Sequence, residues 1–204
     1  RGSFEEIGIL AGNSKYDDNG ELISFTPSNS IIGHALISNK PVVVYGDDFT
    51  IRGGAADASI WEKMITAERF ANEYEVPIVR LIEGTGGGGS VRTLEKDGYT
   101  YVPANPGWDY VINNLAKVPV ISLALGPVAG LGAARLVTSH FSIMVKTLSQ
   151  VFVAGPPLVE KIGEKVSKEE LGGSEIHSKN GVIDILANNE KEAIDMSKTL
   201  LSYL

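Results

Sequence analysis

Two segments of the chain each combine a short apolar run of strand length, a turn of small residues and a helical pattern. The first apolar run, residues 79–83, leads into the glycines of residues 84–90, and the second, residues 120–125, leads into residues 126–134. Glycine has no Cβ, so backbone N–H groups in such a turn can face open space and a ligand can approach them closely. Because the arrangement occurs twice, it predicts an α/β fold with two anion-binding turns.

Strand and helix patterns alternate along most of the chain, which favours parallel strands joined by crossover helices. In the first third, the small polar residues 17–20 predict a hairpin turn. Apolar residues at spacings of three and four predict a helix over residues 58–74, and the acidic Glu190 and Glu192 mark the first turn of a helix over residues 189–203. The other expected strands cover residues 4–10, 22–25, 31–37, 42–45, 78–82, 118–125, 141–145, 151–154 and 182–186, and the other expected helices cover residues 108–116, 129–138, 157–162 and 167–171.

The composition is that of one globular domain of 204 residues with a large core. Hydrophobic residues make up 43% of the chain and charged residues 21%, which excludes a disordered composition. The formal net charge is −7 and the Lys and Arg residues are scattered, so the chain lacks the basic surface that nucleic acids require. No run of apolar residues approaches the roughly 20 that a membrane span needs, so we expect no role in a membrane.

Metal binding and side-chain catalysis receive little support from the sequence. The chain has no Cys, and its histidines, His34, His140 and His177, stand too far apart for the spacing of a metal site. Ser122 can be combined with a His and an Asp on paper, but no G-x-S-x-G turn presents it as a nucleophile. We expect His177 to have a structural role. Glu83, at the end of a predicted strand, lacks the second catalytic Glu that a hydratase or isomerase would need.

Backbone amides are the stronger candidates for binding an anion. A helix that begins near Ala129 would leave the amides of Gly130 and Leu131 unpaired at its positive end. Donors of this kind are each worth about 2.7 to 4 kcal/mol where negative charge develops in a transition state. The alternative is that the small residues 130–134 only permit close helix packing. Glycines 86–89 match neither a dinucleotide fingerprint nor a P-loop, and on their own they are equally compatible with a surface loop.

A series of short motifs extends along nearly the whole chain. They are GSFEE at residues 2–6, PVVVYGDDFTIRGG at residues 41–54, GPVAG at residues 126–130, FVAGPP at residues 152–157, ELGGSEIH at residues 170–177 and GVID at residues 181–184. In order and spacing they resemble the carboxyltransferase subunits of biotin-dependent acyl-CoA carboxylases, within the crotonase superfamily. That family usually has Ser-Gly-Gly-Ala-Arg where this chain has TGGGGSVR at residues 85–92, and Ala-Gly-Gly-Ala where Leu131 here interrupts the glycines.

The resemblance implies a crotonase-like α/β fold, the ββα superhelix of the ClpP and crotonase proteins. It also implies transfer of a carboxyl group from carboxybiotin to the α-carbon of an acyl-CoA. No side-chain base is implied, because the biotin ureido anion takes the α-proton while backbone amides hold the oxyanions. The implied catalytic positions are the amides of Gly130, Leu131, Gly87 and Gly88. The implied substrate-binding positions are Phe49, Arg52, Gly53, Gly54, Gly86 and Ala129.

The same resemblance implies that residues 1–204 are one N-terminal carboxyltransferase domain whose C-terminal half is absent, so we expect the chain alone to be inactive. The expected cofactor is biotin carried on a partner, acyl-CoA is the expected substrate, and no metal is expected. The expected partners are the C-terminal carboxyltransferase domain, the biotin carboxyl carrier, biotin carboxylase and further copies of the chain, in the cytoplasm or the mitochondrial matrix. Two alternatives stay open: a biotin-dependent acyl-CoA decarboxylase subunit, and a non-catalytic CoA-binding or oligomerisation module of the same fold.

Overall fold

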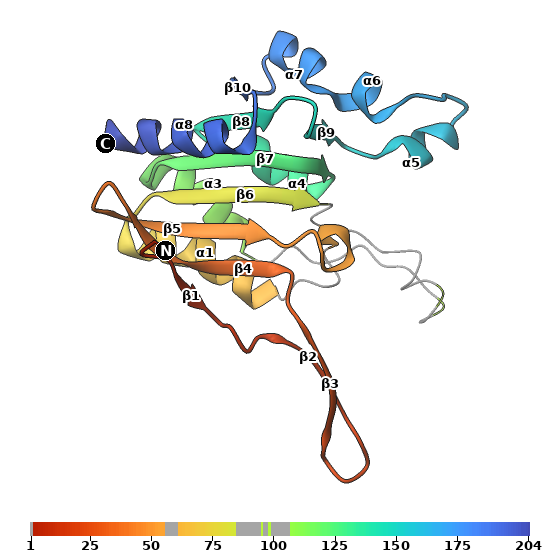
Figure 1. The fold of residues 1–204 in the computed structure, drawn as a ribbon. Coiled ribbons are helices and arrows are strands. Elements are labelled where there is room, and N and C mark those ends of the chain that lie inside the picture. Colours follow the sequence, from red (N-terminus) through yellow and green to blue (C-terminus); the bar gives the residue numbers. More distant parts are fainter. Residues whose placement is uncertain (1, 56–60, 85–94, 96–97, 99–106) are drawn as a thin grey trace.

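The computed structural model describes residues 2–55, 61–84, 95, 98 and 107–204, with only the backbone described at Trp61. Within these residues, an eight-stranded sheet has the order β1-β4-β5-β6-β7-β8-β10, and β9 also pairs with β7. Figure 1 shows helices on both faces of this sheet. The alternation of strand and helix patterns in the sequence predicted this mixed α/β arrangement.

The main sheet begins antiparallel and continues parallel. β1 (Glu5–Ile7) pairs with β4 (Ser30–Ile37), and β4 pairs with β5 (Lys40–Asp47), both in antiparallel fashion. The parallel part contains β5, β6 (Ile78–Gly84), β7 (Val120–Ala129), β8 (Phe141–Val145) and β10 (Ile185–Ala187), and β9 (Gln150–Phe152) runs parallel to β7. The carboxyl ends of β5, β6 and β7 therefore meet at one edge of the sheet (Figure 1).

Helices cover the sheet on both sides. One face carries α1 (Trp61–Tyr74), α3 (Trp108–Lys117) and α4 (Leu131–Val137), and the other carries α8 (Glu190–Ser202). The short helices α5 (Pro156–Glu160), α6 (Lys168–Gly172) and α7 (Ser174–Asn180) follow β9. Among the described residues, every helix is too short or too polar to cross a bilayer.

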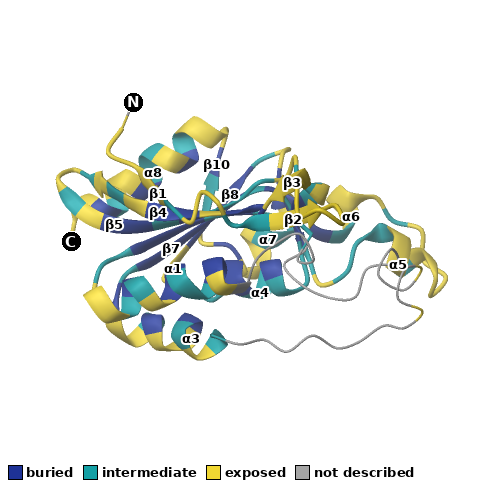
Figure 2. Cartoon of the chain, turned by 90° about the horizontal axis from the view of Figure 1, so that it is seen from below, coloured by how far each residue is buried: buried dark blue, intermediate teal, exposed yellow. Residues whose placement is uncertain are grey.

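The central strands bury side chains on both faces, as Figure 2 shows by their colour. Strands of this kind have nearly continuous apolar sequences, which is why residues 78–82 and 118–125 could be predicted as strands without an alternating pattern. The core under α1 contains Val43, Ile78, Val120, Met64 and Ala67, and the core under α8 contains Val79, Ile121, Leu123, Ala193 and Leu201.

The predicted hairpin turn at residues 17–20 is confirmed. It joins β2 (Gly12–Tyr16) to β3 (Leu22–Pro27), which form a separate two-stranded sheet that projects from the body of the protein (Figure 1). The carboxylate of Asp17 accepts the amides of Asn19 at 2.9 Å and Glu21 at 2.8 Å, and Gly20 adopts a positive φ of 83°. The apolar side chains of this hairpin remain largely outside the core, with Leu22 56% exposed and Ile23 66% exposed.

The boundary between β7 and α4 differs from the sequence prediction. Residues 126–129 continue β7, because they pair with β9 in a register that places Pro127 opposite Gln150 and Ala129 opposite Phe152. The expected helix start near Ala129 is therefore wrong, and α4 begins at Leu131 after Gly130, whose φ is 58° and ψ is −124°. The sequence also did not predict α7, in which Ile176 is the one apolar residue among seven.

A buried ion network joins four elements behind the sheet. Glu68 of α1 accepts hydrogen bonds from Arg80 of β6 at 2.8 Å, from Arg135 of α4 at 3.0 Å and from Asn114 of α3 at 3.0 Å. Arg80 also donates to the carbonyls of Arg135 and Thr138, so a cation closes the C-terminal end of α4, where the helix dipole favours it. Burial by itself would raise the pKa of Glu68, but Arg80 and Arg135 outweigh burial and hold that pKa below its usual value.

We predict that Glu68→Gln lowers the free energy of unfolding at neutral pH by about 3 to 5 kcal/mol, because two buried guanidinium groups lose their counter-charge. Since the folded pKa of Glu68 is lowered, its contribution is complete above its unfolded pKa and is lost as the pH falls through the folded pKa. Urea unfolding of both proteins over a pH series should therefore show the difference shrinking in acid.

Glu73→Gln on the same helix is the matched control. Glu73 is exposed and lies 3.9 Å from Arg69 in an i,i+4 pair, so its loss should cost less than about 0.5 kcal/mol. Equal losses for the two variants, or a difference that is independent of pH, would contradict the assignment of Glu68 as the charged centre of the network.

Candidate functional site

Three backbone segments meet at the carboxyl ends of β5, β6 and β7, the edge at which open α/β sheets bind ligands. They are Gly54 in the short helix η1 (Arg52–Gly54), Gly84 at the end of β6 and Gly132 in α4. A Cβ on Gly54 would lie 2.3 Å from the carbonyl oxygen of Glu83, and a Cβ on Gly132 would lie 2.9 Å from the carbonyl oxygen of Gly84. We call this contact of Gly54, Gly84 and Gly132 the glycine junction, since no larger residue leaves room for it.

The turn from β5 into η1 holds one side of the junction. The carboxylate of Asp48 accepts the amide of Thr50 at 2.9 Å, and the side-chain amide of Asn29 donates to the carbonyl of Ala55 at 2.8 Å. Arg52, Gly53 and Gly54 then take positive φ angles of 55°, 59° and 65° in succession. These contacts fix a tight, left-handed turn at the sheet edge.

The predicted substrate-binding residues of this turn lie together. Phe49 and Arg52 are exposed, and the ring of Phe49 lies 3.7 Å from where a Cβ on Gly53 would stand. Gly54 is instead buried against the end of β6 and serves the junction. That Phe49, Arg52, Gly53 and Gly54 contact a substrate stays a prediction.

The two expected amide donors of the second turn differ in their surroundings. The N–H of Gly130 donates to the carbonyl of Phe152 at 3.2 Å. Contrary to the prediction, Gly130 is therefore not a free donor in this structure. The cause is the extension of β7 beside β9, in which Ala129 pairs with Phe152. Leu131 is the first residue of α4, and among the described residues the structure gives its amide no acceptor. Of these two amides, Leu131 is therefore the one without an acceptor among the described residues.

The glycine-rich segment after β6 carries the other predicted positions. Gly86, Gly87 and Gly88 lie outside the described residues. The chain enters that segment from Gly84, which has a φ of 130° and lies against Gly54.

Asp47, at the end of β5, lies beside the junction. Its carboxylate accepts the amide of Glu83 at 3.0 Å and the hydroxyl of Tyr45. Burial raises the pKa of Asp47, although Arg135 and the two hydrogen bonds act in the opposite direction. Burial also raises the pKa of Tyr45, so its hydroxyl stays protonated and acts as the donor.

The side chain of Glu83 points away from the glycine junction, toward the face of the sheet that α8 covers. Its carboxylate lies against Gly126, where an added Cβ would stand 2.2 Å from Oε1. Burial and the nearby charges of Glu190, Asp47 and Asp48 raise its pKa. The hollow that Glu83 helps to line measures about 320 Å³ and is otherwise mostly apolar.

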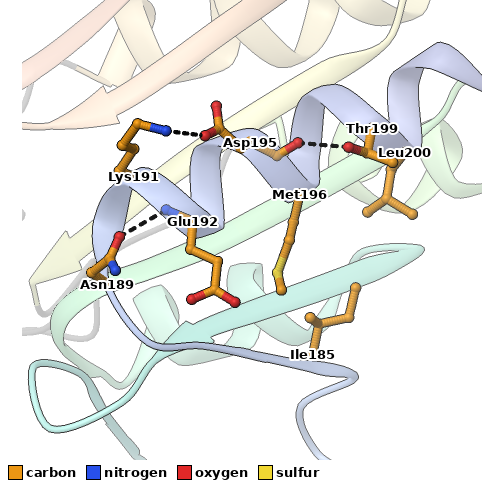
Figure 3. Close-up of a pocket in the computed structure, with 8 residues that line it drawn as sticks. All are labelled: Ile185, Asn189, Lys191, Glu192, Asp195, Met196, Thr199 and Leu200. Atoms are coloured by element: carbon orange, nitrogen blue, oxygen red, sulfur yellow. Dashed lines mark hydrogen bonds and ion pairs between the residues drawn. The ribbon is translucent and has the colours of Figure 1, made fainter.

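The hollow along α8, of about 550 Å³, is lined by the apolar Ile185, Met196 and Leu200 and by polar side chains that already have hydrogen-bond partners (Figure 3). Lys191 contacts Asp195 at 2.6 Å, and Asn189 caps the helix through the amide of Glu192 at 2.9 Å. Thr199 donates to the carbonyl of Asp195 at 2.9 Å. This hollow therefore offers less to a reacting group than the open amide beside the junction.

Two of the three histidines, His140 and His177, are bonded to the backbone, and the third, His34, lies 3.6 Å from the carboxylate of Glu5. His140 accepts the amide of Val120 at 3.0 Å and contacts the carbonyl of Leu115 at 2.9 Å, and His177 contacts the carbonyl of Val151 at 2.6 Å. His177 thus ties α7 to β9, in keeping with the structural role expected for it. Among the described residues, no group of three or more His, Asp or Glu side chains is arranged to hold a metal ion.

The sheet, its helices and the turn of backbone amides at the carboxyl ends of the strands define a crotonase-like α/β fold of the kind found in carboxyltransferases. A family comparison agrees along the entire chain, since the carboxyl transferase domain family matches residues 1–204. The chain belongs to this carboxyl transferase domain family.

Several curated relatives are similar to this chain. It is 30% identical over 206 residues to the biotin-dependent acetyl-/propionyl-coenzyme A carboxylase beta5 subunit of Mycobacterium tuberculosis, covering 99% of this chain and 36% of that protein. It is 31% identical over 180 residues to methylmalonyl-CoA decarboxylase subunit alpha of Veillonella parvula, covering 85% of this chain and 34% of that protein. The chain thus spans about a third of the length of these relatives.

Solved structures have the same fold. The transcarboxylase 12S hexamer, crystallised with methylmalonyl-coenzyme A and methylmalonic acid bound, matches with a TM-score of 0.79 and 25% identity, over 99% of this chain and 39% of that one. The beta subunit of geranyl-CoA carboxylase of P. aeruginosa matches with a TM-score of 0.77 and 24% identity, over 100% of this chain and 36% of that one.

We predict that Gly84→Ala destabilises the chain by about 1 to 3 kcal/mol, because an added Cβ would lie 2.6 Å from the carbonyl oxygen of Gly54 in a tightly packed contact. Chemical denaturation monitored by circular dichroism measures the change. Gly46→Ala, at the neighbouring end of β5, is the control, since its Cβ would meet only Leu81 at an ordinary 3.8 Å. If both variants keep the stability of the parent chain, the glycine junction is looser than described.

Proposed function

We propose that this chain is part of the carboxyltransferase component of a biotin-dependent acyl-CoA carboxylase, and that it binds the acyl-CoA from which an enolate forms. The observation that carries the proposal is the match of the carboxyl transferase domain family to residues 1–204. The open amide of Leu131 beside the glycine junction supports it with a geometry suited to a negatively charged oxygen.

The chemistry asks for positioning and charge stabilisation more than for a side-chain base. Removal of the α-proton of an acyl-CoA breaks a C–H bond and places negative charge on the thioester oxygen. We assign the Leu131 N–H to that oxygen, with Gly87 or Gly88 as the expected second donor. A biotin group carried by a partner would supply the carboxyl group. Once biotin has given up that group, its ureido nitrogen would take the α-proton.

The glycine junction brings the segments of the proposed site together. Gly54, Gly84 and Gly132 lack a Cβ, and backbone atoms of the neighbouring segments take up that room, so the end of β6 and α4 lie close to the turn that carries Phe49 and Arg52. Phe49 and Arg52 are exposed on the adjoining turn, where we assign them to the acyl-CoA or biotin channel together with Gly53, Gly86 and Ala129.

The direction of transfer is a second question. The methylmalonyl-CoA decarboxylase subunit is as similar to this chain as the carboxylase subunit, at 31% and 30% identity. An acyl-CoA decarboxylase subunit is therefore the second candidate, since both reactions pass through the same enolate.

The complete site requires more than this chain. We propose that a C-terminal carboxyltransferase domain, a biotin carboxyl carrier and biotin carboxylase complete the assembly, and that several copies of the chain associate inside the cell. A hexamer is described for the related transcarboxylase 12S. The first test is an assay of the full-length protein, with its carrier, for carboxylation of a panel of short acyl-CoAs.

We predict that Leu131→Pro in the full-length protein lowers kcat/KM about 100- to 1,000-fold, because it removes one oxyanion donor. Proline is tolerated at the first position of a helix, where the N–H has no partner within the helix, so α4 should still form. The measurement is the initial rate of carboxylation at varied acyl-CoA concentration.

Leu131→Ala is the matched control, since it shortens the side chain and keeps the N–H. Its kcat/KM should stay within about 3-fold of the parent protein. If Leu131→Pro and Leu131→Ala have the same activity, the Leu131 amide does not hold the oxyanion. If calorimetry also finds no acyl-CoA binding to the full-length protein, the chain is a structural or oligomerisation module that keeps only the fold.

A further inference from the structure

The carboxylate of Asp47 is placed between the sheet and the candidate site. It lies at the last position of β5 and accepts the backbone amide of Glu83 at 3.0 Å. Glu83 is the residue before Gly84, the point at which β6 ends. This hydrogen bond crosses from β5 to β6 where the register of β6 with β7 is irregular, between Ile82 and Gly84.

Gly84, the residue that follows the Glu83 amide bonded by Asp47, is in direct contact with both other members of the glycine junction. A Cβ on Gly54 would lie 2.9 Å from the Cα of Gly84, and a Cβ on Gly132 would lie 2.9 Å from its carbonyl oxygen. Backbone atoms packed this closely cannot move independently. A displacement of Gly84 would therefore disturb Gly132 and the amide of Leu131, the residue before Gly132.

The other side of Asp47 is connected to α4. Its carboxylate accepts the hydroxyl of Tyr45, and the guanidinium of Arg135 lies 4.1 Å from the centre of the Tyr45 ring. Arg135 belongs to α4 and is paired with Glu68 at 3.0 Å. One carboxylate thus contacts the end of β6 directly and the helix that carries Leu131 through Tyr45.

We propose that Asp47 is a positioning residue of the carboxyltransferase site. By accepting the N–H of Glu83 it holds the end of β6, and with it Gly84, at the distance from α4 that keeps the Leu131 amide open to the oxyanion. The proposal rests on the proposed function. It assigns to Asp47 an effect on turnover, through Gly84, without contact with the substrate.

A purely stabilising role explains this arrangement less well. Because burial raises the pKa of Asp47, the folded state disfavours its charged form, and removing the charge relieves part of that cost. This carboxylate nevertheless accepts hydrogen bonds from the Tyr45 hydroxyl and the Glu83 amide, and it interacts with the positive charge of Arg135. The hydrogen bond to the Glu83 amide is the contact that an apolar residue at position 47 would not replace.

The test uses the full-length protein with its biotin carrier. Asp47→Ala should lower kcat about 10- to 100-fold while KM for the acyl-CoA stays within about 2-fold, because a misplaced donor costs turnover more than binding. Asp47→Asn keeps an oxygen acceptor for the Glu83 amide and should recover most of the lost kcat. Hydrogen exchange of the Glu83 amide should be fast in Asp47→Ala and slow in the parent protein and in Asp47→Asn.

Asn114→Ala is the control for stability. It removes a hydrogen bond to Glu68 in the same network, on the α3 side, so it should lower the unfolding temperature and leave kcat within about 2-fold. If Asp47→Ala does not fold, Asp47→Val, which is similar in size to Asp and favours a strand, takes its place.

The outcomes separate the two proposals. A parent protein that carboxylates acyl-CoA, together with an Asp47→Ala or Asp47→Val variant of unchanged kcat or unchanged Glu83 exchange, overturns the positioning role alone. A parent protein that turns over no acyl-CoA in either direction overturns the proposed function, and the positioning role with it.

Discussion

The contact of backbone with backbone at Gly54, Gly84 and Gly132 is the constraint on which the rest of the site depends. The short helix η1, strand β6 and helix α4 can approach each other this closely only because these three residues have no Cβ. The approach brings a strand end, a helix and a left-handed turn into contact. Under the function proposed above, backbone dipoles at this place supply the charge stabilisation that other enzymes obtain from charged side chains.

Charged side chains have a different task in this protein. Glu68, Arg80 and Arg135 lie under the sheet, where they connect α1, β6 and α4, and Asp47 extends this group of charges to the sheet edge. Burying opposite charges together costs desolvation energy, but the ion pairs fix the relative positions of the elements that carry them. In this way a rigid polar network lies beside the glycine junction.

The sequence predicted most strands and helices, because apolar runs and helical spacing depend on nearby residues. It failed at Ala129 and Gly130, where small residues look like a helix start but pair instead with β9, a segment that follows them by a full helix and strand. It also did not identify Asp47, since the positioning role proposed for it depends on contacts with Glu83 and Arg135, which lie far from it in the sequence. The predicted binding residues near Phe49 lie on one turn, whereas Gly86, Gly87 and Gly88 lie outside the described residues.

The projecting hairpin of β2 and β3 has a consequence for the behaviour of the chain in solution. Within the described residues, each of these strands pairs only with the other, so each has an outer edge of backbone donors and acceptors that no third strand covers. Two strands without a packed face are marginally stable in water, and uncovered strand edges recruit strands from other molecules. Self-association through this hairpin should therefore set the concentration at which the purified chain can be handled.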